Sequence, residues 1–319
     1  MLSHPRPLPA AVPPDGPEGD ARVPHEAAGS RVEPRIGARL VAWTVAVLAA
    51  AGVWMTWRVF VATARGQRVD ELAFEGAVHG QGRLWAVAEP VLDVVSVAFV
   101  VAGVGAAVLV AVVRRRWVLA LQVAALVAGA NITTQLAKRV LFDRPDLLPG
   151  WNAPNALPSG HTTVAASVSA ALLLATPRTW RPVVAVLGAA YTGATGISTL
   201  VGQWHRPSDV VAALLVVLAW AAAVCALTPA SSLDAPRTPG ASLASPGSSV
   251  VAGLMLLASA AAGALALGAL AGLAGARWDV PFANDMTAYA GGVCGVLAAT
   301  GAVFAILLLV RQASARPRR

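Results

Sequence analysis

The sequence contains few charged residues. Asp, Glu, Lys and Arg together account for 13% of the 319 residues, whereas 57% are hydrophobic. Soluble globular domains carry about 25% charged residues. This composition excludes an ordinary soluble domain and is typical of an integral membrane protein.

The sequence is also poor in cysteine, and its basic residues are scattered. The only two cysteines, Cys225 and Cys294, lie in apolar segments, where packing as small apolar side chains is the favoured role. The net charge is +8, but no basic patch interleaved with aromatic residues occurs. We therefore expect no nucleic-acid partner, and the lipid bilayer as the environment.

Long apolar runs fill most of the chain after residue 38. About 20 mostly apolar residues are needed to cross roughly 30 Å of hydrocarbon. Eight segments meet this requirement: 39–62, 84–113, 116–138, 160–177, 180–203, 207–227, 250–274 and 288–310. Backbone groups in lipid must be hydrogen-bonded within their own segment, and no segment alternates as a barrel strand does. The sequence therefore predicts an all-α, polytopic membrane protein.

Composition divides this chain into five parts. We expect a disordered cytoplasmic arm at 1–38, a six-helix membrane core at 39–227 and a cytoplasmic linker rich in Pro, Ser and Gly at 228–249. Two additional transmembrane helices would form a C-terminal hairpin at 250–310, followed by a basic cytoplasmic tail at 311–319.

Arginine clusters predict the orientation. They follow the second, fourth and eighth apolar segments, which places them on one side of the membrane together with the N-terminal arm. The positive-inside rule makes that side cytoplasmic. Both termini are then expected in the cytoplasm, and the connections after the third and fifth segments on the extracytoplasmic side.

Three polar clusters lie on the predicted extracytoplasmic side. They are Lys138 with Arg144-Pro145, the stretch Pro158-Ser159-Gly160-His161, and His205 with Asp209. Alone, each has a structural explanation: a lysine that snorkels, a proline that stops a helix, or a serine that caps one. Their coincidence at one membrane surface favours a shared functional site.

These clusters resemble the type 2 phosphatidic acid phosphatase superfamily, whose pattern is K-x6-R-P, then P-S-G-H, then S-R-x5-H-x3-D on six membrane helices. The middle motif is complete, and the third keeps Ser198, His205 and Asp209. Two positions depart from the pattern. The first motif is one residue short, so that either its connection is tighter or Arg139 takes part of the lysine's role. Thr199 replaces the arginine of the third motif, and Arg206 either compensates for it or faces lipid headgroups.

The resemblance implies a role for each motif residue. His205 would attack phosphorus, Asp209 would orient His205, and His161 would act as general acid and base. The phosphate would be held by Lys138, Arg144, Ser159 and Gly160, the last two at a helix N-terminus. This scheme requires no metal and no other cofactor.

The predicted surface location favours a lipid phosphate as substrate: a phosphatidate, a phosphatidylglycerol phosphate or a polyprenyl diphosphate. The alternative is a protein that binds or transports a lipid phosphate with weakened or lost catalysis, as Thr199 would allow. The loop at 64–80 is interpreted as a connector, with an interfacial helix covering the site as the alternative. The sequence leaves the oligomeric state open.

Overall fold

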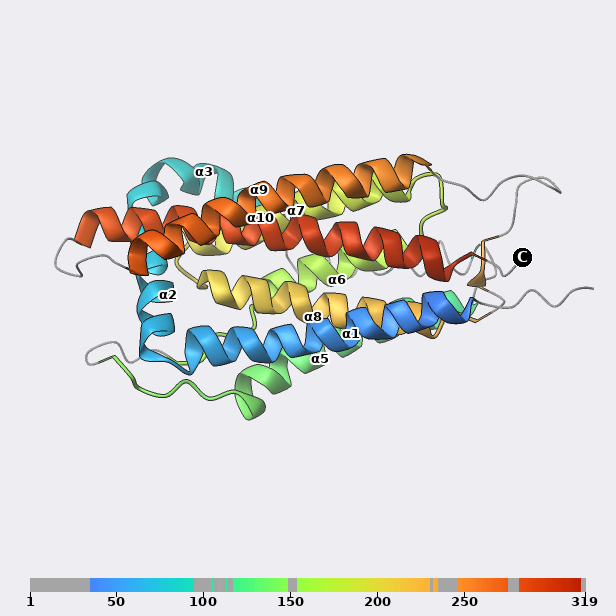
Figure 1. Ribbon diagram of the computed structural model, residues 1–319, viewed down its shortest axis with the longest axis horizontal. Coiled ribbons are helices and arrows are strands. Elements are labelled where there is room, and N and C mark those ends of the chain that lie inside the picture. The colour runs from blue at the N-terminus through green and yellow to red at the C-terminus, as the bar shows by residue number, and fades with distance from the viewer. Residues whose placement is uncertain are drawn as a thin grey trace, which may run out of the picture. The chain divides into compact units, whose positions relative to one another are not determined.

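The computed structural model describes residues 35–94, 117–148, 154–229, 232–234, 246–274 and 281–316, and the single positions 105, 109 and 113. The described residues form an all-α bundle (Figure 1). Its α-helices are α1 (Ile36–Thr56), α2 (Ala64–Gly76), α3 (Val78–Val94), α5 (Trp117–Leu136), α6 (Gly160–Ala175), α7 (Arg181–Val201), α8 (Pro207–Ala226), α9 (Pro246–Ala274) and α10 (Pro281–Ser314). Two π-helical turns, η1 (Trp57–Val61) and η2 (Ala137–Leu141), extend α1 and α5.

Six helical segments among the described residues are long and apolar enough to cross a membrane, so the prediction of a polytopic membrane protein is confirmed. They are Ile36–Val61, Trp117–Leu141, Arg181–Val201, Pro207–Ala226, Gly247–Leu273 and Asn284–Ser314. The predicted span at 160–177 forms the shorter apolar helix α6, with 16 residues.

Some predicted segments differ from the structure or lie outside it. Helix α3 covers the start of the predicted span at 84–113, and most of the remainder lies outside the described residues. Most of the predicted arm at 1–38 lies outside them too, although α1 already begins at Ile36. Helix α9 begins within the predicted linker, and α10 continues to Ser314 within the predicted tail.

Helix α8 lies at the centre of the bundle. In its most apolar window 72% of the residues are buried, against 11% in the corresponding window of α9. The helix can sit there because Ala, Val and Leu make up its buried surface, with α1, α5, α6 and α10 packed around it. This helix, which begins within the third predicted cluster, is therefore the most enclosed of the six candidate membrane spans among the described residues.

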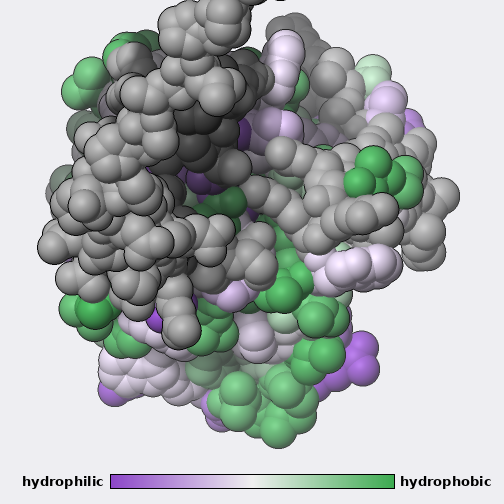
Figure 2. Space-filling view, turned by 90° about the vertical axis from the view of Figure 1, so that its right-hand side faces the viewer, coloured by the Kyte–Doolittle hydropathy of each residue, from purple (hydrophilic) through white to green (hydrophobic). Residues whose placement is uncertain are grey.

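A buried ion pair joins α7 to the chain after α8. The guanidinium of Arg181, at the start of α7, is fully buried and donates from Nη1 and Nη2 to the two carboxylate oxygens of Asp234, both at 2.8 Å. Nη1 also donates to Oε1 of Gln312 on α10, at 3.2 Å. Figure 2 views this end of the bundle, where purple hydrophilic and green hydrophobic side chains lie side by side. The pair ties the C-terminal hairpin to the core.

The loop at 64–80 is helical, so its interpretation as a connector is wrong. Most of it forms α2, which runs across the opposite end of the bundle (Figure 1). Thr63 caps this helix, its Oγ1 accepting a bond from the Gly66 N–H at 3.1 Å. The helix forms because its buried residues recur at helical spacing, among them Leu72, Ala73 and Gly76.

Polar contacts hold α2 against the ends of two other helices. Nε2 of Gln67 donates to the carbonyl oxygens of Val61, at 2.7 Å, and Pro145, at 2.8 Å. Asp70 accepts from Ser208 at the start of α8, from its N–H at 3.2 Å and from its hydroxyl. Burial, reinforced by the negative charge of Asp209, raises the pKa of Asp70 to about 7, although the bonds from Ser208 oppose this shift.

We expect Asp234→Asn to destabilise the protein strongly, because it leaves the buried Arg181 guanidinium without its counter-charge. Loss of one partner of a buried ion pair costs about 3–5 kcal/mol. Thermal unfolding of the purified protein in detergent would show a lowered Tm. The exposed Asp143 provides the matched control, and Asp143→Asn should leave Tm unchanged. Equal Tm values for the two variants would contradict a structural role for the pair.

Asp70 should make stability depend on pH. Its pKa is raised from 3.8 to about 7 on folding, so between these values the native state retains a proton that the unfolded state has lost. Stability therefore falls as pH rises through this window. We expect the Tm of wild type to fall from pH 5 to pH 8, and Asp70→Asn to reduce that fall. Asp143→Asn should behave as wild type. A fall of the same size in Asp70→Asn would rule out Asp70 as its source.

Candidate functional site

The three predicted clusters lie at one end of the bundle. They occupy η2 and its following connection, the start of α6, and the turn between α7 and α8 with the first turn of α8. This is the end across which α2 runs, and it is opposite the end at which α1 starts and α10 finishes (Figure 1). A direct bond joins two of the clusters, from the Ser159 N–H to the Asp209 carbonyl oxygen at 2.9 Å.

His205 and Asp209 form a buried pair. Nδ1 of His205 lies 3.2 Å from Oδ2 of Asp209, one helical turn farther along the chain. The same oxygen accepts the Arg206 N–H at 3.0 Å, so that the Asp209 carboxylate caps the start of α8. Because Nδ1 faces the carboxylate, Nε2 is the ring nitrogen left for a substrate. The imidazole is thus held in one orientation.

His161 lies beside His205, in the first turn of α6. The two ring centroids are 6.1 Å apart, and the side chain of His161 is exposed whereas that of His205 is buried. The ring of Trp204 packs against His161 at 5.2 Å. The structure therefore brings together two histidines whose positions in the sequence differ by 44.

The start of α6 offers backbone donors next to His161. Ser159 is fully buried and caps the helix, its Oγ accepting the Thr162 N–H at 3.3 Å. A Cβ added at Gly160 would meet only Nε2 of Gln135, at 4.0 Å. Glycine therefore leaves open space above the helix N-terminus, where an anion is favoured. The peptide bond between Leu157 and Pro158 is cis.

Lys138 and Arg144 approach the same region from the first cluster. Lys138 lies on η2 within electrostatic range of Asp209 and His161, and its carbonyl oxygen accepts a bond from Nδ2 of Asn155 at 3.3 Å. The Arg144 side chain is 5% exposed. Burial first, and then the charge of Arg206, lowers the pKa of the Arg144 guanidinium from its usual value. The short first motif therefore still brings both cations to the site.

Arg206 is buried, which excludes the interpretation that its side chain faces lipid headgroups. It is 5% exposed, and its guanidinium lies 5.0 Å from the ring centroid of Phe74. Nε and Nη2 lie 2.7 and 2.6 Å from Oε2 of Glu71. The same oxygen lies 3.5 Å from Nη2 of Arg144. Two guanidiniums therefore share one carboxylate, at the edge of the site.

The remaining candidates divide into buried and exposed positions. Ser198 and Thr199 are buried near the end of α7, and the Thr199 hydroxyl donates to the Gly196 carbonyl oxygen at 2.7 Å. Thr199 thus bonds within its own helix. Arg139 is exposed on η2 and lies within electrostatic range of Lys138.

Sequence reasoning missed Asp70 and Glu71 of α2, the two carboxylates that contact this region. A signal was present: the apolar residues at 69, 72, 73 and 76 recur at helical spacing beside the charged ones. Among the described residues no group of three or more His, Cys, Asp and Glu side chains is arranged to hold a metal ion.

Comparison with protein families identifies one match. Residues 117–232 match the family model described as PAP2 superfamily, and this segment contains every predicted site residue from Lys138 to Asp209. Comparisons with curated proteins and with solved structures gave no match. The matched segment includes all three clusters in the order of the family pattern and on membrane helices. The match agrees with the resemblance noted from the motifs: this segment is similar to the PAP2 superfamily, whose members are phosphatases.

Proposed function

We propose that this protein hydrolyses a lipid phosphate or a polyprenyl diphosphate at the membrane surface, through a phosphohistidine intermediate. One observation carries the proposal: the imidazole of His205, oriented by Asp209 at 3.2 Å, lies with its centroid 6.1 Å from that of His161. A fixed nucleophile beside a second histidine is the arrangement that two-step phosphoryl transfer needs.

In the first step, Nε2 of His205 attacks phosphorus and the bond from phosphorus to the leaving oxygen breaks. Asp209 accepts the Nδ1–H bond and stabilises the positive charge that develops on the ring. His161 gives its proton to the leaving oxygen, which departs as an alcohol or as a phosphate.

In the second step, water replaces the leaving group. His161, now neutral, takes a proton from water, whose oxygen attacks phosphorus as the bond to Nε2 of His205 breaks. Inorganic phosphate is released and both histidines return to their starting state. The exposure of His161 favours this exchange, since its side chain is open to solvent at the site.

The negative charge of the phosphate is met by cations and N–H groups. Lys138 and Arg144 supply two cations, and the open start of α6 at Gly160 supplies backbone donors. Arg206 takes the place of the arginine that the family has at the position of Thr199. Its closeness to Arg144, through the shared Glu71, supports this assignment.

The substrate class follows from the position of the site at one end of a membrane bundle. A phosphate there is at headgroup depth, which suits a phosphatidate, a phosphatidylglycerol phosphate or a polyprenyl diphosphate. The distribution of arginines supports an extracytoplasmic site with both termini in the cytoplasm. Reaction in this scheme needs no metal ion.

The alternative function is binding or transport of a lipid phosphate without efficient cleavage. Thr199 favours it, because its hydroxyl is bonded to Gly196 and adds no cation. The two functions differ in one observable, the release of inorganic phosphate.

His205→Ala should abolish phosphate release, because it removes the attacking nitrogen. We expect kcat to fall by about 10³-fold or more, as it does when other nucleophiles are removed. The assay would measure phosphate release from phosphatidate, phosphatidylglycerol phosphate and undecaprenyl diphosphate with EDTA present. The control is His79→Ala, an exposed histidine of α3, which should retain activity. Unchanged turnover in His205→Ala would refute the mechanism. Saturable binding by wild type without any phosphate release would favour the alternative function.

Arg206→Lys should weaken phosphate binding although the charge is kept. Lysine cannot reproduce the planar fork that contacts Glu71 and Phe74. Loss of one charge-assisted hydrogen bond corresponds to about 10-fold to 100-fold in KM. Steady-state kinetics would measure this increase, with Arg65→Lys, an exposed position of α2, as the control. A KM unchanged by Arg206→Lys would exclude Arg206 from phosphate binding.

A further inference from the structure

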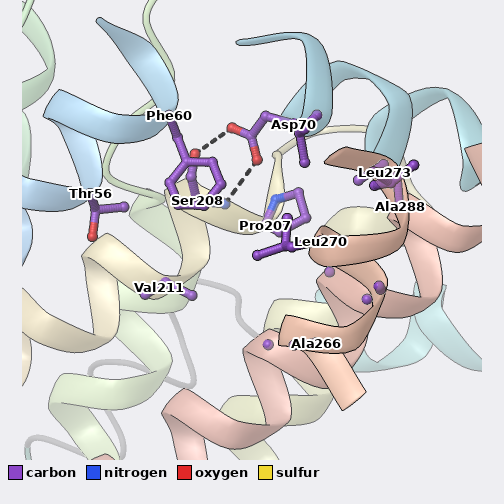
Figure 3. A pocket seen from close by; sticks show the side chains of 16 residues that line it. Thr56, Phe60, Asp70, Pro207, Ser208, Val211, Ala266, Leu270, Leu273 and Ala288 are labelled. Carbon is purple, nitrogen blue, oxygen red and sulfur yellow. Dashed lines mark hydrogen bonds between the residues drawn. The ribbon is translucent and has the colours of Figure 1, made fainter. Parts of the chain in front are cut away.

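An apolar cavity lies behind the start of α8. It encloses about 110 Å³ between η1, α2, α8, α9 and α10. Figure 3 shows Phe60, Val211, Leu270 and Leu273 around it, with Asp70 and Ser208 at one edge. Protein interiors rarely leave gaps larger than one water molecule. A cavity of this size therefore requires an explanation.

The lining shows which kind of molecule the cavity favours. Asp70 and Ser208, two of its few polar residues, are bonded to each other, as the dashed lines in Figure 3 indicate. The rest of the wall is mostly Ala, Gly, Val, Leu and Phe. An apolar cavity of on the order of 150 Å³ stays dry and takes up apolar guests. The cavity thus favours hydrocarbon over water or a polar ligand.

Small residues of α10 allow it to pack closely against both α8 and α9. A Cβ at Gly292 would lie 2.5 Å from Cγ of Pro207, and a Cβ at Gly291 would lie 2.6 Å from Cβ of Ala269. The segment that matches the family contributes Pro207, Ser208 and Val211 to the wall, whereas most of the other lining residues come from α2, α9 and α10. The cavity therefore depends on helices outside the segment that matches the family, including both helices of the C-terminal hairpin.

On two elements, residues of the phosphate site are direct sequence neighbours of residues that line the cavity. On the turn into α8, His205 and Arg206 face the site and the next two residues line the cavity. On α2, Glu71 binds the guanidiniums whereas its neighbour Asp70 lines the cavity. A molecule with a phosphate and an apolar chain would match both regions.

We propose that this cavity binds one hydrocarbon chain of the lipid whose phosphate is held by Arg144 and Arg206. The inference rests on the proposed function, since it assigns the chain to the substrate. Its volume of about 110 Å³ suits a section of a single chain and is too small for a helix. On the α9 side Leu270 is 36% exposed, so the wall reaches the outer surface of the bundle, where lipid surrounds the protein.

Filling the cavity tests the proposal. In Ala266→Phe a ring replaces a methyl group in the wall, and Ala266→Leu is a milder change of the same kind. Ala264→Phe is the matched control, since Ala264 is exposed on the same helix. Full-length proteins in nanodiscs would be assayed on phosphatidates with 16-carbon and 4-carbon chains.

We expect both Ala266 variants to raise KM for the 16-carbon substrate, by about tenfold in Ala266→Phe, with little change for the 4-carbon substrate. Loss of contact for two methylene groups corresponds to about this factor. Ala264→Phe should match wild type on both. Equal KM values for wild type and both folded Ala266 variants on the 16-carbon substrate would overturn the proposal.

A second measurement separates this proposal from the proposed function. Nanodiscs containing a 16-carbon phosphatidate with a diazirine on its chain would be irradiated, and adducts on Val211 and Leu273 compared with those on the exposed Leu257. We expect Ala266→Phe to lower that ratio about fivefold and Ala264→Phe to leave it unchanged. An unchanged ratio in Ala266→Phe would refute the cavity's role even if the enzyme is active. A lowered ratio in a protein that releases no phosphate would support chain binding and refute the phosphatase.

Discussion

The site depends on one carboxylate oxygen, Oε2 of Glu71, which lies between the guanidiniums of Arg144 and Arg206. Both arginine side chains are nearly buried. Two positive charges that share one carboxylate oxygen repel each other strongly where water is excluded. The carboxylate offsets that repulsion while leaving a net positive charge, where the proposed function places the substrate phosphate. Because Glu71 belongs to α2, the docking of this short helix is a condition for bringing the first and third motifs together. The bonds from Gln67 to Pro145 and from Ser208 to Asp70 fix it there.

The sequence predicts best what depends on local pattern. Continuous apolar runs predicted the membrane helices, and the start of α6 at Gly160 and of α8 at Pro207 agree with the prediction to the residue. Helix α2 was expected only as the alternative to a connector, because it is short and polar. Its burial comes from contacts with residues 70 to 140 positions away in the sequence. The pairing of Glu71 with two arginines has the same origin. A sequence shows which residues are charged, but the partner of a buried charge is decided by tertiary packing.

The C-terminal hairpin has a structural consequence at each end of the bundle. At one end Gln312 of α10 joins the ion pair of Arg181 with Asp234, which connects the hairpin to α7. At the other end Gly292 allows α10 to approach Pro207, two residues after His205. A displacement of the hairpin would therefore reach both the cavity wall and the turn that carries the histidine. Two helices without a chemical motif of their own thus support the geometry of the site.

In the proposed function, Arg206 supplies the cation that the third motif lacks at Thr199. An arginine at 199 would extend from the last turns of α7, whereas Thr199 is buried and bonded to Gly196. Arg206 lies instead in the turn between helices, and a long side chain there has no helix to restrict its rotamers. Glu71 and the ring of Phe74 supply that restriction from outside the motif. The cation and the helix that holds it therefore form a unit, which explains why a short polar helix is packed over this end of a membrane bundle.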